Sequence, residues 1–293
     1  MNILKKKIPS LLIVLLVYLF ATALGVVSYI YIPIDPTMIW LKLLVADALA
    51  TVAIFIFSVI FDNSSMYDAY WSVQPIVIVL AFFIVSPITI FSILALIAVL
   101  VWGIRLTVNW IYTFDNLKWE DWRYKMYREK MGKLYWPVSF LGIHMVPTLV
   151  VYGAIIPVVY GIVSAPTANP ATYIFFVLAI LSAVLQGTAD IQMHKYRKNR
   201  VTPFIRTGLW KHSRHPNYLG EITMWWSMGL MATITMNEPI YYIFLVGALA
   251  NTLLFLFISI PMADKRQSSK EGFEQYKKET FMLLPIKKFW IKK

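Results

Sequence analysis

Residues 211–234 read KHSRHPNYLGEITMWWSMGLMATI, a polar stretch that runs directly into an apolar one. The polar part, residues 211–221, holds two basic residues, two histidines, an asparagine, a tyrosine and a glutamate. A charged cluster that opens a long apolar helix is typical of a membrane span beginning at the membrane surface. The stretch therefore indicates a helical membrane protein, in which the polar part either anchors the chain to lipid or lines a site.

The composition of the whole chain agrees with a membrane protein. Of its 293 residues, 59% are hydrophobic and 14% are charged, and the mean hydropathy is +0.65. Soluble domains carry about 25% charged residues. The net charge of +12 fits nucleic acid, anionic lipid or an anionic ligand. The absence of cysteine excludes disulfides, thiolate zinc sites and cysteine nucleophiles, and we expect no metal site.

Apolar runs that are long enough to cross a bilayer predict an all-α, polytopic protein with about eight spans. The runs cover residues 8–32, 37–61, 66–86, 88–111, 136–163, 171–194, 217–236 and 239–262. If residues 73–111 formed one helix, it would be about 60 Å long, roughly twice the bilayer core, so Pro87 marks a break between two spans. The N-terminal stretch resembles a signal peptide, but its apolar run continues to Ile32, which favours a retained helix.

The basic residues predict the orientation of these spans. Lys and Arg fall into four groups, at 5–7, 118–133, 195–214 and 265–293, which together hold 25 of the 27. With eight spans all four groups, and both termini, lie on one side, which the positive-inside rule makes the cytoplasm. We therefore expect a protein of the cell inner membrane whose positive charge orients it and contacts anionic lipid, with no nucleic-acid partner and no obligate protein partner.

Ionisable residues within the spans are costly and need a reason. Asp47 is expected to be a neutral, hydrogen-bonded carboxyl at a helix contact. For Arg105 two interpretations stay open: it extends to the cytoplasmic interface beside the membrane-belt residues Trp102 and Trp110, or it binds a ligand in the interior.

Asp190, His194 and Arg197 lie four and three residues apart, which places them on one face of a helix. This face belongs either to a helix that leaves the membrane into a basic collar or to the wall of a cavity that opens to the cytoplasm.

The stretch at 211–221 has the features of an anion site at a helix N-terminus. Pro216 suits the first helical position and His215 the cap, with Lys211 and Arg214 beside them. Unpaired N–H groups flanked by positive charge favour phosphate or pyrophosphate. Asn217, Tyr218 and Glu221 follow on the same helix, and a lipid anchor would need none of them.

Two further clusters accompany this stretch. Asp264 and Arg266 follow the last span directly, and Tyr276 belongs to an expected amphipathic helix before the terminal lysine pairs, which we expect to be an electrostatic anchor. EDWRY at 120–124 is expected to be an interfacial amphipathic segment, or to lock loops around a ligand through Glu120, Asp121 and Arg123.

These motifs occur in the same order as in a known membrane family. They are EDWRY at 120–124, QGTADIQMHKYRKN at 186–199, TGLWKHSRHPNYLGE at 207–221 followed by WW, and DKRQ, FEQY and LLP from residue 264 onward. On these motifs, over about residues 65–290, the chain resembles the family called domain of unknown function 1295. That family is grouped with the steroid 5-alpha-reductases and, more distantly, the sterol C14 reductases. The resemblance implies a reductase domain at 63–293 and additional transmembrane helices at 1–62.

The resemblance also implies an activity and a site. It implies a helical enzyme that holds NADPH in a cytoplasm-facing cavity and transfers hydride to an activated C=C of a lipid-like substrate, such as a steroid, isoprenoid or acyl lipid. The residues that correspond to the cofactor site are Asp190, Arg197, Trp210, Arg214, His215, Asn217, Tyr218, Glu221, Asp264, Arg266 and Tyr276. Tyr218 and Glu221 are the expected catalytic residues, with Tyr218 or a residue at 68–74 as the proton donor.

The chain departs from the steroid reductases in one respect. Those enzymes polarise an enone carbonyl with a tyrosine–glutamate pair, whereas the comparable stretch here reads VWGIR, with Trp102 in place of the tyrosine. Asp68, Tyr70 and Gln74 are the candidates for its partner. Cofactor binding therefore follows from the resemblance more directly than steroid reduction does.

Two other classes of function stay open. Isoprenylcysteine carboxyl methyltransferases share the RHPxY signature and bind S-adenosylmethionine, but they usually carry paired glutamates where this chain has Asp264-Lys265-Arg266. A basic site suits a phosphate-bearing cofactor better than a cationic sulfonium. The third class is a non-catalytic lipid-binding scaffold or a transporter, although the repeated halves common in transporters are not detectable here.

Overall fold

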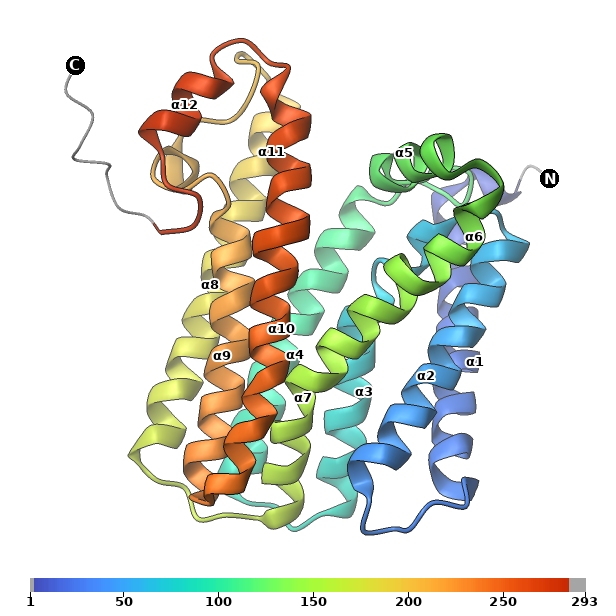
Figure 1. Ribbon diagram of the computed structural model, residues 1–293, viewed down its shortest axis with the longest axis vertical. Coiled ribbons are helices and arrows are strands. Elements are labelled where there is room, and N and C mark those ends of the chain that lie inside the picture. Colours follow the sequence, from blue (N-terminus) through green and yellow to red (C-terminus); the bar gives the residue numbers. More distant parts are fainter. Residues whose placement is uncertain (1–2, 285–293) are drawn as a thin grey trace.

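The computed structural model describes residues 3–284, and these form helices joined by short loops (Figure 1). The helices are α1 (Lys7–Tyr31), α2 (Ile39–Ile60), α3 (Tyr70–Val85), α4 (Ile90–Thr113), α5 (Trp122–Met131), α6 (Tyr135–Val138), α7 (Val146–Ser164), α8 (Pro170–Lys198), α9 (Pro216–Met236), α10 (Val246–Leu254), α11 (Ile260–Ser268) and α12 (Phe273–Glu279). Segments of 3₁₀-helix lie at Ile3–Lys5, Ser64–Tyr67, Gly132–Leu134, Gly208–Lys211 and Pro239–Leu245, and π-helical turns at Ser139–Met145 and Phe255–Ser259. The described chain contains no β-strand, so the expected all-α fold is confirmed.

The helical segments are those of an integral membrane protein. Within residues 3–284, seven of them are long and apolar enough to cross a bilayer: Lys7–Tyr31, Ile39–Ile60, Ser64–Val85, Ile90–Thr113, Trp122–Ser164, Pro170–Lys198 and Pro239–Ser268. They coincide with seven of the eight expected spans. The eighth, 217–236, corresponds to α9, which carries polar residues and buries thirteen of its 21 residues among other helices. The number of spans therefore stays a prediction.

The break expected at Pro87 is confirmed. Helix α3 ends at Val85 and α4 begins at Ile90, and Thr89 caps α4 by accepting a hydrogen bond from the Ser92 backbone N–H at 3.1 Å. Because a proline disfavours helical geometry in the residue before it, Ser86 is extended and the chain reverses there.

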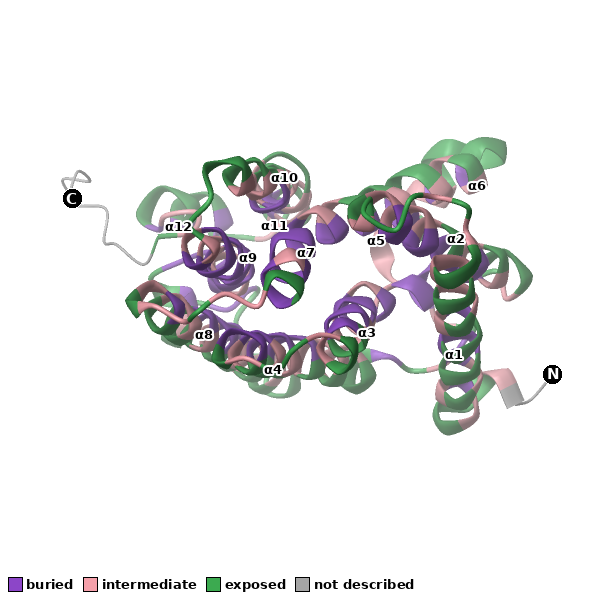
Figure 2. Cartoon of the chain, turned by 90° about the horizontal axis from the view of Figure 1, so that it is seen from below, coloured by how far each residue is buried: buried purple, intermediate pink, exposed green. Residues whose placement is uncertain are grey.

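Helix α9 occupies the centre of the C-terminal half of the bundle. It packs against α7, α8 and α10, as the view along the bundle shows (Figure 2). Helices α7 and α10 approach so closely at Gly153 and Gly247 that a Cβ atom on Gly247 would lie 2.0 Å from the Gly153 carbonyl carbon. Such small-residue contacts bring membrane helices together without hydrophobic driving force. On the other side, α1 packs on α2, and α4 bridges α3 and α8.

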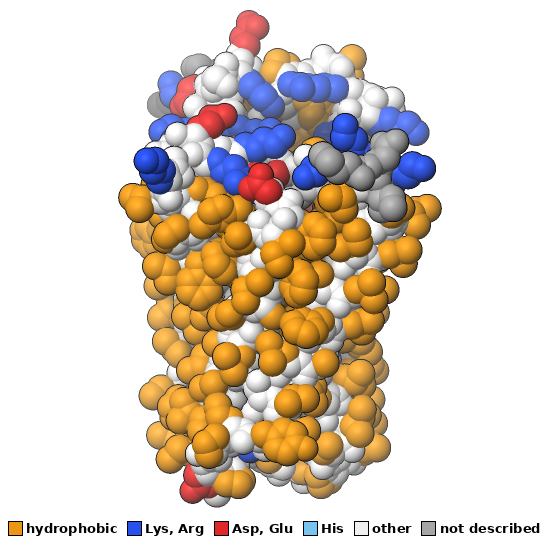
Figure 3. All heavy atoms as spheres, turned by 90° about the vertical axis from the view of Figure 1, so that its right-hand side faces the viewer, with side chains coloured by type: hydrophobic (Ala, Val, Ile, Leu, Met, Phe, Trp, Pro, Cys, Tyr) orange, Lys and Arg blue, Asp and Glu red, His pale blue; other side chains and the backbone are white. Residues whose placement is uncertain are grey.

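Basic side chains gather at one end of the bundle, which we call the basic end (Figure 3). Helix α1 begins there and α11 ends there, while hydrophobic side chains cover the length of the bundle below (Figures 1 and 3). This surface is that of a protein surrounded by lipid. The terminal lysines at 287, 288, 292 and 293, expected to act as an anchor, lie outside the described residues, as do both chain termini.

Two expectations for residues within the spans are wrong. Trp102 is not a membrane-belt residue, because its side chain is fully buried between α4 and α9. Asp47 does not form the expected hydrogen bond, because neither of its carboxyl oxygens has a partner among the described residues, although the residue is only 4% exposed. In both cases hydropathy identifies the span but not the direction of the side chain.

Candidate functional site

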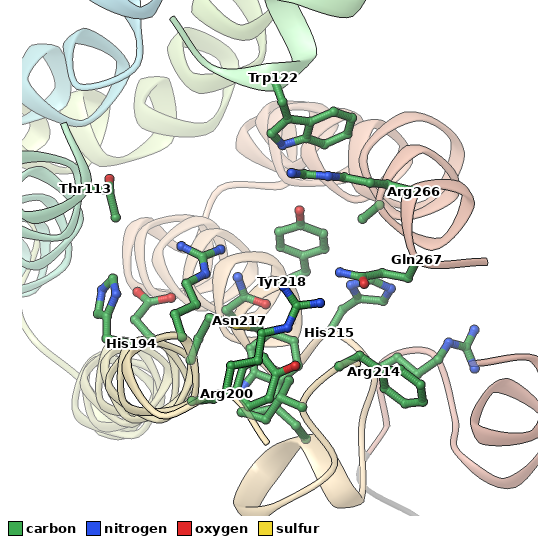
Figure 4. A pocket seen from close by; sticks show the side chains of 18 of the residues that line it. Thr113, Trp122, His194, Arg200, Arg214, His215, Asn217, Tyr218, Arg266 and Gln267 are labelled. Carbon is green, nitrogen blue, oxygen red and sulfur yellow. The ribbon is translucent and has the colours of Figure 1, made fainter. Parts of the chain in front are cut away.

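A cavity of about 1030 Å³ opens at the basic end of the bundle (Figure 4). Its walls come from the ends of α4, α8 and α11, the start of α9, and the segments around α5 and α12. Ten of the eleven residues expected at a cofactor site line it: Asp190, Arg197, Trp210, Arg214, His215, Asn217, Tyr218, Asp264, Arg266 and Tyr276. Segments far apart in the sequence thus meet in one space, as the interpretation of these motifs requires.

One wall of the cavity is the end of α8. Asp190, His194 and Arg197 all line it, so the expected polar face points into a cavity and does not form a surface collar. Asp190 accepts a hydrogen bond from Arg105 of α4 at 2.5 Å, and Arg105 also donates to Gln186. Arg105 is therefore the ion-pair partner of a carboxylate that lines the cavity.

The start of α9 forms the second wall. His215 is the N-cap residue and Pro216 the first helical residue, as predicted. The His215 ring stacks on Tyr218, with ring centroids 5.2 Å apart, and its Nε2 lies 2.9 Å from Oδ1 of Asp264 on α11. These contacts hold the cap in place and turn the first helical turn toward the cavity.

Arg214 is largely engaged within the protein. Its Nη1 donates to the Thr280 carbonyl at 2.6 Å and to the Lys277 carbonyl at 3.2 Å, and its Nη2 lies 3.2 Å from Asp264. Only its buried Nε lacks a partner. Arg214 thus fastens the C-terminal segment to the start of α9, and its charge is offset by Asp264.

Trp210 and Tyr276 contribute their aromatic rings to the cavity wall, because their polar groups are already hydrogen-bonded within the protein. The Trp210 indole donates to the Ala189 carbonyl at 3.1 Å, and the Tyr276 hydroxyl donates to the Trp210 carbonyl. Tyr276 also packs with Phe204 and Phe273, and all three rings line the cavity. Aromatic faces of this kind suit a flat ring system.

Five basic side chains line the cavity without an ion-pair partner among the described residues: Arg197, Lys198, Arg200, Arg266 and Lys270. Partial burial, followed by the charges of Arg200, Arg266 and Arg197, lowers the pKa of Lys270 from its usual range. Neighbouring positive charges repel one another, and an anion bound between them would relieve that repulsion.

Sequence reasoning missed Arg200, Lys270 and Trp122 as parts of this wall. Arg266 lies over the Trp122 ring of α5, 4.1 Å from its centroid (Figure 4), in a cation–π contact that ties α11 to α5. Arg200 and Lys270 follow Arg197 and Arg266 by three and four residues. Both lie just past a helix end, since α8 ends at Lys198 and α11 at Ser268, so helical spacing alone does not place them.

Two polar groups deeper in the cavity wall lack protein partners. Asn217 Oδ1 is buried without a hydrogen bond, and the Tyr218 hydroxyl, which also lines the cavity, makes none with the described residues (Figure 4). A buried amide oxygen without a donor costs about 1–3 kcal/mol. An amide or ammonium donor of a bound ligand would remove that cost.

Glu221 is the one expected site residue that does not line the cavity. Its two carboxyl oxygens accept hydrogen bonds from the indoles of Trp102, at 2.8 Å, and Trp225, at 2.9 Å. The two rings lie edge to face, with centroids 4.8 Å apart. Glu221 therefore joins α4 to α9 in the interior, next to the wall that carries Asn217 and Tyr218.

The EDWRY segment covers one side of the cavity. Asp121, Trp122 and Arg123 line it, while Glu120 is buried and accepts a hydrogen bond from the Ser64 backbone N–H at 2.9 Å. The segment is thus held against the turn before α3, consistent with the expected loop lock. Asp68, Tyr70 and Gln74 are the candidates named above for the group that polarises the substrate carbonyl. Asp68 accepts a hydrogen bond from Arg123 at 3.3 Å, whereas Tyr70 and Gln74 line a different cavity.

Comparison with known proteins identifies a family. No curated protein and no solved structure matches the chain. The family model described as protein of unknown function (DUF1295) matches residues 54–280, from the second half of α2 to the end of α12. The match includes every element that lines the cavity at the basic end. The chain therefore belongs to the DUF1295 family of membrane proteins.

Proposed function

We propose that the protein is an NADPH-dependent reductase that acts on an activated C=C of a lipid-like substrate, with its cavity facing the cytoplasm. The observation that carries the proposal is the cavity at the basic end, where five basic side chains without ion-pair partners among the described residues surround a space next to a helix N-terminus. The resemblance of the motifs to the steroid 5-alpha-reductases supports the same assignment.

The outer part of the cavity fits a phosphate-rich ligand. Arg197 at the end of α8, Arg266 at the end of α11, and Arg200 and Lys270 just after these helices would hold the pyrophosphate and 2′-phosphate of NADPH. Arginine binds phosphate through two parallel hydrogen bonds, and the α9 N-terminus adds a positive end of the helix dipole. The Phe204 and Tyr276 rings offer a surface for the adenine.

The inner part of the cavity fits the reactive end of the cofactor. NADPH, when bound, supplies the hydride. Asn217 Oδ1 would accept a hydrogen bond from the carboxamide of the nicotinamide, which would satisfy its unpaired oxygen. The Tyr218 hydroxyl would provide the proton that completes reduction of the substrate. Glu221, behind them, would fix the position of this turn of α9 through its two indole hydrogen bonds.

Calorimetry on the purified protein in detergent, with NADPH, NADH and S-adenosylmethionine as ligands, tests the proposal. We expect binding of NADPH, and about tenfold weaker binding in Arg197→Ala and in Arg200→Ala, because each loses a charged contact with phosphate. Lys195→Ala is the matched control, since Lys195 lies on the same part of α8 but does not line the cavity.

Other results would favour the remaining classes. Binding of S-adenosylmethionine without binding of NADPH would contradict the reductase and support a membrane methyltransferase. Binding of neither would favour a scaffold that keeps the fold without the chemistry.

A further inference from the structure

A second cavity, of about 290 Å³, lies between α1, α2 and α3 and shares no lining residue with the cavity at the basic end. Alanine, valine, isoleucine and phenylalanine side chains make up most of its wall. Val26, Ile30 and Ala81 stand at its edge and are exposed on the surface that faces lipid. An apolar ligand can therefore enter this cavity from the bilayer, independently of the proposed reductase site.

Thr22, Tyr29 and Tyr70 also line the cavity, but two other polar side chains of the wall carry buried atoms without a hydrogen bond among the described residues. Asp47 of α2 and Gln74 of α3 are 4% and 7% exposed, and both line the cavity. The Gln74 amide lies close enough to the Asp47 carboxyl to interact with it as a donor, yet neither oxygen of Asp47 nor Nε2 of Gln74 makes a well-formed hydrogen bond among the described residues. Each such group left without a partner costs about 1–3 kcal/mol.

No cation of the described chain neutralises Asp47 by an ion pair. The nearest candidate in sequence, Lys42 on α2, instead lies over the Tyr29 ring, 5.0 Å from its centroid. Polar residues of this kind inside a membrane span are expensive and generally have a functional partner. The Asp47 carboxyl therefore stays open to a ligand in the cavity.

We propose that this cavity binds a lipid alcohol, an apolar molecule with a single hydroxyl head. The carboxyl of Asp47 offers an acceptor and the amide of Gln74 offers a donor, and one hydroxyl group satisfies both, because it donates one hydrogen bond and accepts another. A ketone or an ether has no hydrogen to donate, so it would leave the carboxyl oxygen of Asp47 without a donor. The cavity thus distinguishes an alcohol from otherwise similar lipids by about the cost of one buried unpaired group.

The size of the cavity limits how much of the lipid it encloses. Small-molecule pockets commonly measure about 300–1,000 Å³, so this one holds the hydroxyl head and the adjacent part of a chain or ring. The rest of the molecule would extend past Val26 and Ala81 into the hydrocarbon layer. Helix α1 and the first half of α2, which form half of this site, precede the region matched by the family model.

The test uses the full-length protein in phosphatidylcholine nanodiscs and a sixteen-carbon alcohol with a diazirine in its chain as the probe. After illumination, mass spectrometry of peptides should locate the label on α1, α2 and α3 at the cavity. The unlabelled alcohol should displace the probe at least tenfold more effectively than the matching methyl ether or ketone. Asp47→Leu and Gln74→Leu should each reduce labelling of the cavity about tenfold.

A second pair of variants keeps the proposal testable if the polar substitutions disturb folding. Ala81→Phe places a ring at the exposed edge of the cavity and should block labelling. Leu80→Phe adds a ring to the neighbouring exposed position, which does not line the cavity, and should leave labelling unchanged. Thermal unfolding of each variant verifies that the bundle is intact.

Three results would overturn the proposal: label spread evenly over all lipid-facing helices, equal displacement by the ether or ketone, or full labelling of Ala81→Phe. NADPH calorimetry on the same variants separates this proposal from the proposed function. In the variants, loss of alcohol labelling with intact NADPH binding is the expected result. In the unaltered protein, binding of NADPH without the alcohol, or of the alcohol without NADPH, would contradict one assignment and leave the other standing.

Discussion

The protonation of Lys270 is sensitive to its neighbours. Partial burial and the nearby charges of Arg200, Arg266 and Arg197 lower the pKa of its ammonium group. A phosphate placed among these groups would favour the protonated form and raise that pKa. Binding of a phosphate ligand should therefore take up a proton at pH values between the lowered pKa of the free protein and the raised one of the complex.

NADPH affinity should accordingly depend on alkaline pH. We expect the dissociation constant to increase as the pH rises through the lowered pKa of Lys270, because the neutral amine no longer attracts phosphate. In Lys270→Arg the charge persists, so the dependence should become much flatter over the same interval. Calorimetric titrations at a series of pH values measure both. Identical pH profiles for the two proteins would show that Lys270 does not contact the phosphate.

Among the interior carboxyls, sequence reasoning identified the residues but not their partners. The hydropathy pattern singled out Asp47 and Glu221 equally, because each is an ionisable residue within an apolar run. In the structure Glu221 receives two indole hydrogen bonds, whereas Asp47 receives none. The difference depends on which helices meet: Trp102 lies 119 positions before Glu221 in the chain, and no local pattern joins them.

At the scale of helices, the start of α9 is fastened to the C-terminal segment. Arg214 was predicted from its position to bind phosphate. Its guanidinium instead donates hydrogen bonds to Asp264 and to the carbonyls of Lys277 and Thr280. A basic residue next to a helix N-terminus can bind either a ligand or the protein's own carbonyls. The choice depends on how the segment after α11 folds back, which the sequence of 211–221 does not contain.

Removing the contacts of Arg214 with the C-terminal segment should lower the stability of the protein. We expect Arg214→Ala to destabilise the protein by about 3–5 kcal/mol, because it removes one partner of a buried ion pair whose side chains are 8% and 10% exposed. Thermal unfolding in detergent measures the loss, and hydrogen exchange should show faster exchange in α12. Arg206→Ala is the matched control.

Arg206 also joins the loop before α9 to α12, through Glu279 at 3.5 Å, but the two side chains are 47% and 45% exposed. Solvent screening limits such a pair to about 0–1 kcal/mol. Equal destabilisation by Arg206→Ala and Arg214→Ala would contradict the distinction between a buried fastening and a surface pair.

At the scale of the whole molecule, the lengths of the apolar runs predicted the helical bundle well. They did not predict where the helices end outside the apolar runs. The span expected at 171–194 is α8, which runs from Pro170 to Lys198 and thus continues beyond the apolar run. That extension carries Arg197 to the cavity. Helix formation needs no apolar residues once the chain leaves lipid, so hydropathy locates the membrane-crossing part but not the polar end that builds the site.

The orientation of the bundle can be tested directly because the chain has no cysteine. The basic groups at one end predict that this end faces the cytoplasm. In intact cells, a membrane-impermeant maleimide should then label Thr37→Cys and Thr167→Cys, which are exposed in the loops after α1 and α7 at the other end of the bundle. Lys125→Cys and Ser269→Cys, exposed at the basic end, should react only after the cells are permeabilised. The reverse pattern would place the large cavity outside the cytoplasm, away from cellular NADPH, and would count against the reductase as well as the topology.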